Sequence, residues 1–223
     1  MSRFTYPVLA LLFLLIASGC SSSKEISNDT SAIDLERLEA IYKARQEKDK
    51  NRYVQGDIDF MTGMIGHHAQ ALIMSGMAPE NGANPEVQLL ASRIINAQQD
   101  EIATMQKWLG DRDQIVPEVH IDGLTLMLHG VDEHHAHMPG MLSSDQMEEL
   151  QASRGPEFDR LFLTYMIQHH SGAISMVKVL FATDGAGLDD TSFKLASDIQ
   201  VDQITEIARM ERLETLEGDL PYL

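Results

Sequence analysis

Apolar residues recur at intervals of three and four along four long segments of the chain. We place these segments near residues 57–78, 85–110, 156–183 and 189–217. Such spacing collects apolar side chains on one face of an α-helix and predicts amphipathic helices. Two polar stretches, APENGANP and TDGAGLDD, separate the first helix from the second and the third from the fourth. Because stretches of this kind mark turns, the four helices are expected to form two helical hairpins.

The two hairpins are related by an internal repeat. At an offset of 102 residues, MIGHHAQALIM (64–74) matches MIQHHSGAISM (166–176), and a second match at an offset of 105 relates 91–105 to 196–210. Two similar hairpins predict a duplicated four-helix bundle, which we place at 55–217. A charged amphipathic segment within 34–54 adds an N-terminal helix. We expect no strand, so the fold class is all-α.

The first twenty residues have the pattern of an export signal. A basic start precedes the apolar run VLALLFLLI, which is too short to span a bilayer, and small residues then lead to Cys20, the only cysteine. This order is typical of a bacterial lipoprotein, although Ala17 stands where leucine is commoner and leaves ordinary cleavage open. We expect a signal peptide at 1–19, a lipidated Cys20 and a flexible tether at 20–33.

This N-terminus predicts where the protein resides. It would be exported and held by its lipid anchor at the periplasmic face of the cell envelope, and the serine after Cys20 favours the outer membrane. Acidic residues outnumber basic ones 34 to 17, for a net charge of −17. This balance argues against nucleic acid as a partner and favours cations. With a single cysteine, soft-metal chemistry has to use methionine and histidine.

The doubled histidines flank the apolar stripe of their helix. At about 100° per residue, His67 and His68 fall on the two sides of the stripe, so both rings can face the core. Met61 and Met64 share a helix face with His68, which lets two thioethers and an imidazole converge. The equivalent pair in the repeat is His169 and His170, with leucine in the position of Met61.

Polar residues of the partner helices also face inward, among them Glu101 and Glu206. A buried carboxylate is costly unless it is paired, and the histidines are the obvious partners. Two interpretations remain open. In the first, the glutamates hold the histidines in a purely structural pairing and the methionines fill the core. In the second, imidazoles and thioethers ligate a metal while Glu101 and Glu206 orient the rings, and this donor set favours Cu(I).

The connection between the hairpins, at about 111–144, is rich in potential metal ligands. Within thirteen positions it holds His129, His134, His135, His137, Met138 and Met141. Short histidine-rich tracts commonly bind metals. Asp132 and Glu133 add hard oxygen ligands, so this loop suits Cu(II) or zinc as well as Cu(I).

No catalytic motif supports an enzyme. The four bundle segments lack the Glu-x-x-His motif of di-iron carboxylate proteins, and the sequence lacks the Gly-x-Ser-x-Gly motif of serine hydrolases. We therefore expect no enzymatic activity, and a metal-dependent oxidase is the weakest alternative.

Two copies of HHxxAxxM, the EIxxM segments that follow them and the stretch MPGMLSSDQMEELQ resemble the family of the domain of unknown function 305. The resemblance covers about residues 55–216. It implies a ferritin-like four-helix bundle, export and, as in copper-binding members, Cu(I) held by methionine and histidine. Besides the histidine pairs, the family motif contains Met64, Met74, Met166 and Met176.

The sequence thus predicts an envelope copper-binding protein that sequesters or hands over Cu(I) in metal tolerance. Its partners would be the metal ion, the membrane through the lipid anchor, and an envelope protein or a second copy of the chain. The alternative is a structural or interaction bundle without catalytic activity, in which the histidine–glutamate pairs only stabilise the fold.

Replacing Cys20 by alanine should release the protein from the membrane fraction, because the lipid would lose its attachment point. Fractionation and N-terminal analysis of the mature protein measure this. An unmodified protein that is soluble and begins at another residue would contradict the lipid anchor.

Overall fold

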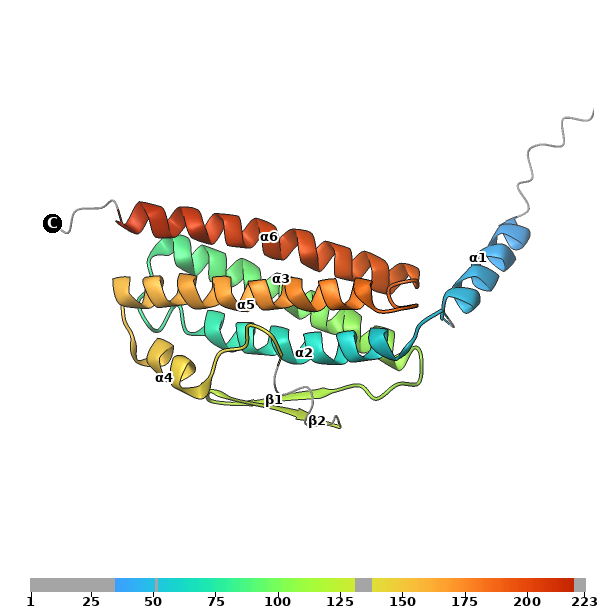
Figure 1. Cartoon of the computed structure of the whole chain (residues 1–223), viewed down its shortest axis with the longest axis horizontal. Coiled ribbons are helices and arrows are strands. Elements are labelled where there is room, and N and C mark those ends of the chain that lie inside the picture. The colour runs from blue at the N-terminus through green and yellow to red at the C-terminus, as the bar shows by residue number, and fades with distance from the viewer. Residues whose placement is uncertain (1–34, 51, 131–137, 219–223) are drawn as a thin grey trace, which may run out of the picture. The chain divides into compact units, whose positions relative to one another are not determined.

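The computed structural model describes residues 35–50, 52–130 and 138–218, and within them the chain is mostly helical with one small sheet (Figure 1). The elements are α1 (Leu35–Lys50), α2 (Gln55–Gly76), α3 (Pro85–Gly110), β1 (Glu118–Asp122), β2 (Thr125–His129), α4 (Ser144–Ala152), α5 (Pro156–Ala182) and α6 (Asp190–Gly218). The five expected helices are all present, with ends within a few residues of the expected ones. The signal peptide, the tether and Cys20 lie outside the described residues.

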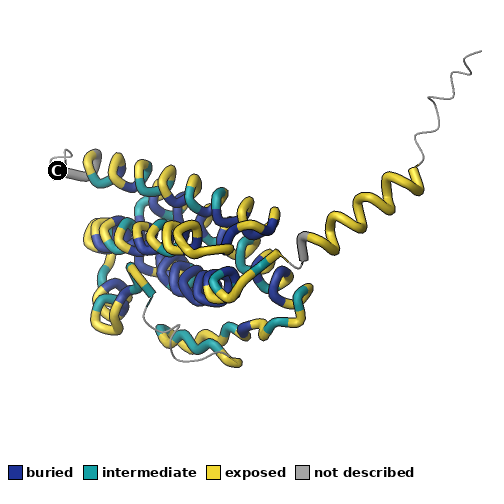
Figure 2. Tube along the Cα trace, turned by 45° about the vertical axis from the view of Figure 1, so that its right-hand side comes forward, coloured by how far each residue is buried: buried dark blue, intermediate teal, exposed yellow. Residues whose placement is uncertain are grey.

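The chain divides into two units, Met1–Ala40 and Ile41–Leu223. The division falls inside α1, whose described side chains, residues 35–48, are exposed (Figure 2). The fold and the sites described below belong to the second unit. None of the helices in the described part of the chain is long and apolar enough to cross a membrane.

Proline and capping residues define several helix ends. Pro85 and Pro156 stand in the first turns of α3 and α5, where the missing N–H removes no helical hydrogen bond. The Asn84 side chain caps α3 by accepting two backbone amides of the first turn, each at 2.9 Å. Ser143 caps the short α4, a helix that the sequence analysis did not anticipate.

Each hairpin makes hydrogen bonds to the loop of the other hairpin. α2 packs against α3, α5 packs against α6, and the hairpins meet along α2 and α5 (Figure 1). At the start of α2, Asp57 accepts hydrogen bonds from the Gly187 amide at 2.8 Å and the Ser192 hydroxyl at 2.7 Å. Its repeat equivalent Asp159 accepts the backbone and side-chain amides of Asn84 at 3.0–3.1 Å. Because this contact occurs twice with the roles exchanged, an approximate two-fold axis relates the repeats.

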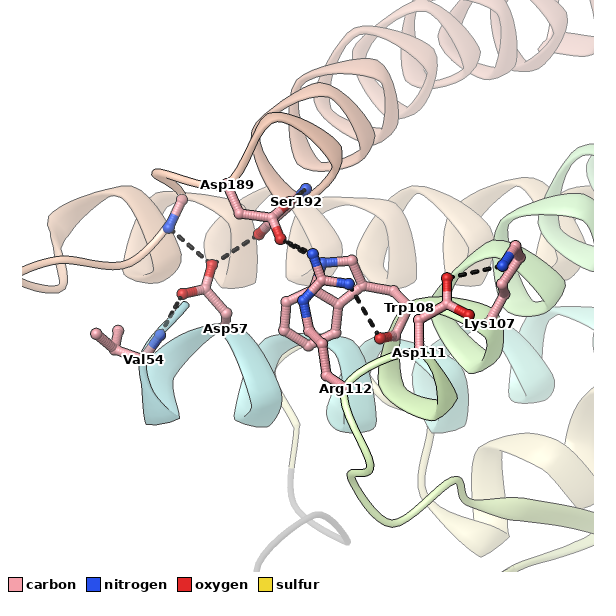
Figure 3. Close-up of polar contacts among 9 residues, drawn as sticks. Val54, Asp57, Lys107, Trp108, Asp111, Arg112, Asp189 and Ser192 are labelled. Atoms are coloured by element: carbon pink, nitrogen blue, oxygen red, sulfur yellow. Dashed lines mark hydrogen bonds and ion pairs between the residues drawn. The ribbon is translucent and has the colours of Figure 1, made fainter. Parts of the chain in front are cut away.

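A buried ion pair ties the end of α3 to the start of α6 (Figure 3). Oδ2 of Asp189 accepts hydrogen bonds from the Arg112 guanidinium and, at 2.9 Å, from the Trp108 indole N–H. Oδ1 accepts the Ser192 amide in the first turn of α6 at 2.8 Å. The guanidinium also lies 4.2 Å from the centroid of the Trp108 ring, in a cation–π contact. The charge of Asp189 is therefore fully compensated inside the protein.

The connection between the hairpins contains a β-hairpin, so the prediction of no strand is wrong, although the described chain is mostly helical. β1 and β2 pair antiparallel around a two-residue turn, in which Gly123 has a φ of 60°. The apolar face of this β-hairpin packs on α2, and Gly66 makes room for it, since a Cβ there would lie 2.5 Å from Cδ1 of Leu128. Polar and apolar residues alternate in EVHIDGLTLMLH over a short stretch only, and the apolar residues are buried only through their contact with α2.

Replacing Arg112 by alanine leaves the Asp189 carboxylate buried without its cation. We expect the free energy of unfolding to fall by about 3–5 kcal/mol, measured by urea denaturation. Lys107→Ala is the matched control, because the nearby Lys107–Asp111 pair, 2.7 Å apart, is exposed (Figure 3). That change should cost less than about 1 kcal/mol. Equal losses in the two variants would show that burial of the Arg112 pair does not matter.

Candidate functional site

The helical core consists of two apolar halves with a polar layer between them. One half joins the C-terminal part of α2 to the N-terminal part of α5, and the other joins the opposite ends of the same helices. Between the halves lie the almost completely buried side chains of His67, His68, Gln98, His169, His170 and Gln203. We call these residues, together with Glu101 and Glu206, the histidine layer.

Two successive histidines can both be buried because α2 is covered on several sides. Neighbouring residues of a helix point about 100° apart. α2 contacts α3, α5 and the β-hairpin, and 15 of its 22 residues are buried. His67 and His68 therefore enter different parts of the layer, and neither has any exposed surface.

The outer histidines pair with glutamates in both repeats, as predicted. Nε2 of His68 lies 2.7 Å from Oε2 of Glu101, and Nε2 of His170 lies 2.6 Å from Oε2 of Glu206. A carboxylate only accepts, so Nε2 donates in each ring, and Nδ1 is the remaining nitrogen, which has a lone pair in the neutral form of an imidazole. Both Nδ1 atoms are buried and have no hydrogen-bond partner among the described residues.

The inner histidines meet each other near the two-fold axis. The rings of His67 and His169 have centroids 3.8 Å apart and planes inclined at 39°. Nε2 of His67 donates to the carbonyl of Pro139 at 3.0 Å. Nδ1 of His67 and both ring nitrogens of His169 have no partner among the described residues.

The inner rings are neutral at neutral pH. Burial, reinforced by the neighbouring His68, lowers the pKa of His67 from 6.5 to about 3. Burial and the adjacent His67 also place the pKa of His169 well below its usual value. A neutral imidazole has one lone pair, so each inner ring has a nitrogen that can bind a cation.

Residues 138–142, which we call the strap, cross the histidine layer at the Pro139 carbonyl. The strap touches the backbone of α5, because a Cβ at Gly172 would lie 1.9 Å from the Pro139 oxygen. Gly140 has a φ of 79°, which favours glycine. The Gln70 amide exchanges two hydrogen bonds, of 3.1 and 2.8 Å, with the backbone of the last strap residue. These contacts hold the Pro139 carbonyl where His67 needs an acceptor.

Sequence reasoning missed Gln70 and Gly172, although both stand inside the doubled-histidine motifs. A signal for Gly172 does exist. Glycine in a helix interior costs about 1 kcal/mol relative to alanine, so its presence there often marks a close backbone approach. Gln70 has no comparable signal, because a glutamine within a helix is ordinary.

The methionines of the bundle helices surround the layer with thioethers. Those without exposed surface are Met61, Met64, Met74, Met105, Met166 and Met210. Met176 is partly buried and packs on the half of the core that contains Met64. In the strap, Met138 and Met141 are partly buried, and the Met138 methyl group lies beside Gly66, next to His67. Met64 and Met166 each stand one helical turn before a histidine pair.

An acidic cleft of about 210 Å³ borders the layer between α3 and α6. Three carboxylates, of Glu101, Asp202 and Glu206, line it together with one guanidinium, of Arg93, and the buried Gln98 and Gln203. Both amide atoms of Gln98 and Oε1 of Gln203 lack hydrogen-bond partners among the described residues. Partial burial and the nearby glutamates raise the pKa of Asp202. The cleft thus offers a cation negative charge directly beside the imidazoles.

His129 is not part of the histidine layer, and its assignment to an irregular loop is wrong. It ends β2, where its exposed side chain approaches His120. The remaining loop histidines, His134, His135 and His137, lie outside the described residues. In the part of the chain that the structure describes, no group of three or more His, Cys, Asp or Glu side chains is placed to hold a metal ion.

Residues 57–214 match the family DUF305, described as a domain of unknown function. The chain belongs to this family. A DUF305 fragment from Deinococcus radiodurans is 28% identical, with a TM-score of 0.60, and the match covers 75% of this chain and 99% of that one. A DUF305 protein from Streptomyces coelicolor, 24% identical with a TM-score of 0.61, shares the fold over 75% and 97% of the two chains.

This DUF305 protein is also similar to CopM. CopM in its Cu(I)-bound form is 27% identical, with a TM-score of 0.53, and the match covers 71% of this chain and 95% of CopM. The Cu(II)-bound form and the silver-bound form obtained by co-crystallisation match with the same TM-score. No match to this DUF305 protein is found among curated proteins.

The metal-free protein should lose stability as the pH falls from 6.5 toward 3. The unfolded chain protonates its histidines near pH 6.5, whereas the folded state keeps His67 and His169 neutral, so each removes up to about 1.4 kcal/mol per pH unit from the free energy of unfolding. Urea denaturation between pH 7.5 and 5 measures the slope. His67→Gln should reduce this slope by up to about 1.4 kcal/mol per pH unit, which is the contribution of one histidine. His120→Gln, at an exposed position, serves as the control. An unchanged slope in His67→Gln would contradict the shifted pKa.

Proposed function

We propose that this DUF305 protein binds Cu(I) in the histidine layer and sequesters it or hands it over in metal tolerance. The observation that carries the proposal is the state of the buried ring nitrogens. In His67, His68 and His170, Nε2 is engaged by a carbonyl or a carboxylate, and Nδ1 is buried without a partner among the described residues. Metal-binding histidines have this arrangement, because the engaged N–H orients the ring and raises its basicity.

A purely structural role explains the histidine–glutamate pairs but not the lone pairs. Each buried polar atom without a partner costs about 1–3 kcal/mol. Five ring nitrogens of the layer are in this state among the described residues, and phenylalanine or leucine could fill the same space without that cost. Both ring nitrogens of His169 are in this set, and one of them carries a proton, so bound cations would give up to four of the five a partner and offset that part of the cost.

The donor set favours a soft monovalent ion. Imidazole and thioether are the ligands that Cu(I) prefers when thiolate is absent, and Met64 and Met166 supply fully buried thioethers beside the histidine pairs. The likeness to CopM, which has been solved with Cu(I) and with silver bound, supports the same choice. Copper would then be the cargo of the protein, reached through the acidic cleft, and we propose no enzymatic activity.

We also propose that α2, α3, α5 and α6 form a bundle of the ferritin-like type and that the protein works in the cell envelope. The two hairpins, packed along α2 and α5, support the first point. The export signal and Cys20 support the second, including the lipid anchor on the outer membrane. A receiving envelope protein or a second copy of the chain would be the partner for handover, and the charge of −17 disfavours nucleic acid.

The double change Met64→Leu and Met166→Leu tests the proposal, because it removes two soft donors while nearly conserving volume. We expect the tightest Cu(I) affinity to fall at least ~10-fold, in the range typical of changes around a metal site. The free energy of unfolding should change by less than about 1.5 kcal/mol per site. Competition against a colorimetric Cu(I) chelator without oxygen measures the affinity, and a parallel zinc titration should show weaker binding.

Met147→Leu is the matched control for this experiment, because Met147 is a buried methionine of α4 outside the histidine layer. It should keep the affinity for Cu(I). The second variant, His67→Gln with His169→Gln, should lose the tight site. If both double variants keep the parental Cu(I) affinity and change only stability, the layer is structural and the alternative interpretation holds.

A further inference from the structure

The outer face of the β-hairpin carries two histidines that the histidine layer does not use. In the antiparallel register, His120 stands opposite Met127, and His129 stands opposite Glu118. These residues alternate with those that face α2, such as Leu128, so they share the face directed away from the bundle. His120, His129 and Glu118 are exposed, and Met127 is partly buried.

The two histidines are diagonal neighbours, and their separation suits a shared metal ion. Their ring centroids lie 6.1 Å apart, with planes inclined at 50°. A metal at about 2.0–2.1 Å from one nitrogen of each ring lies about 3 Å from each ring centre, so two rings on one metal have centroids roughly 5–6.5 Å apart. The observed spacing falls in this range without any movement of the strands.

We propose that His120 and His129 form a surface site for a divalent transition metal, with Cu(II) preferred. Imidazole nitrogen suits Cu(II) and zinc, and among divalent ions such ligands bind Cu(II) most strongly. The Glu118 carboxylate, opposite His129, adds negative charge, and water completes the coordination. This site differs from the histidine layer in exposure, in donor type and in the oxidation state that it favours, so it goes beyond the proposed function and does not depend on it.

The strands give this pair an advantage over histidines on an irregular segment. Backbone pairing already fixes the spacing of His120 and His129, so metal binding has to order only two side chains. Packing of Leu128 into the space at Gly66 holds the β-hairpin on α2. A purely structural role would leave a ring contact worth about 0.2–1 kcal/mol, which predicts no metal dependence.

Titration of the full chain with Cu(II) tests this site. Calorimetry measures the affinity, and the nitrogen hyperfine pattern in electron paramagnetic resonance reports how many nitrogens bind the metal. The parent for the test carries His134→Ala, His135→Ala and His137→Ala, which removes the histidines between β2 and the strap. We expect this parent to bind one Cu(II) through two nitrogens. Adding His120→Ala or His129→Ala should each lower the affinity at least ~10-fold and remove the two-nitrogen pattern.

Thr125→Ala is the matched control, because Thr125 lies on the same strand face and offers no imidazole. It should bind Cu(II) like the parent. If His120→Ala also binds like the parent, the site does not exist. If the two-nitrogen pattern disappears only in His67→Gln with His169→Gln, Cu(II) occupies the histidine layer and the surface site is wrong, whereas the proposed function stands. Loss of the Cu(II) site in the His120→Ala or His129→Ala variant, with the Cu(I) affinity unchanged, supports the surface site.

Discussion

The burial of a polar layer across the middle of the helical core is the constraint on which the rest of the structure depends. Four imidazoles have no exposed surface, and two carboxamides are almost as deeply buried. Each such group needs a partner, because a buried polar atom without one destabilises the fold. Glu101 and Glu206 supply two partners from α3 and α6, and the strap supplies a third. The layer also divides the apolar core, which increases the importance of ties at the bundle ends, where Asp57, Asp159 and the Arg112–Asp189 pair lie.

The repeats provide the layer with two-fold symmetry, and the strap breaks it. Each copy contributes one histidine–glutamate pair of nearly the same length. Among the described residues only His67 has a hydrogen bond to a strap carbonyl, however, and Gly172 makes room for that Pro139 carbonyl on the opposite hairpin. His169 is left as the imidazole with two unpartnered nitrogens among the described residues. The two copies of one motif have therefore acquired different chemical environments.

How much could be predicted from the sequence depended on the range of the interaction. The hairpins and the pairing of Glu101 with a histidine were predictable, because helical periodicity and an internal repeat report which residues face the core. The β-hairpin was not predicted, since its five-residue strands gain their burial from α2. The approach of His120 to His129 depends on strand register, and the position of the strap against α5 depends on its backbone contact with Gly172. Neither leaves a periodic pattern in the sequence.

The contact between His67 and His169 has a consequence for the origin of the protein. Equivalent residues of the two repeats contact each other where the approximate two-fold axis passes, which is also the geometry of an isologous interface between identical chains. A dimer of identical helical hairpins could therefore have built the same layer before the two copies were joined. Within one chain the two hairpins need a connection on one side only, and that connection carries the β-hairpin and the strap. An internal repeat with a single connection thus accounts for a symmetric cluster that has an asymmetric cover.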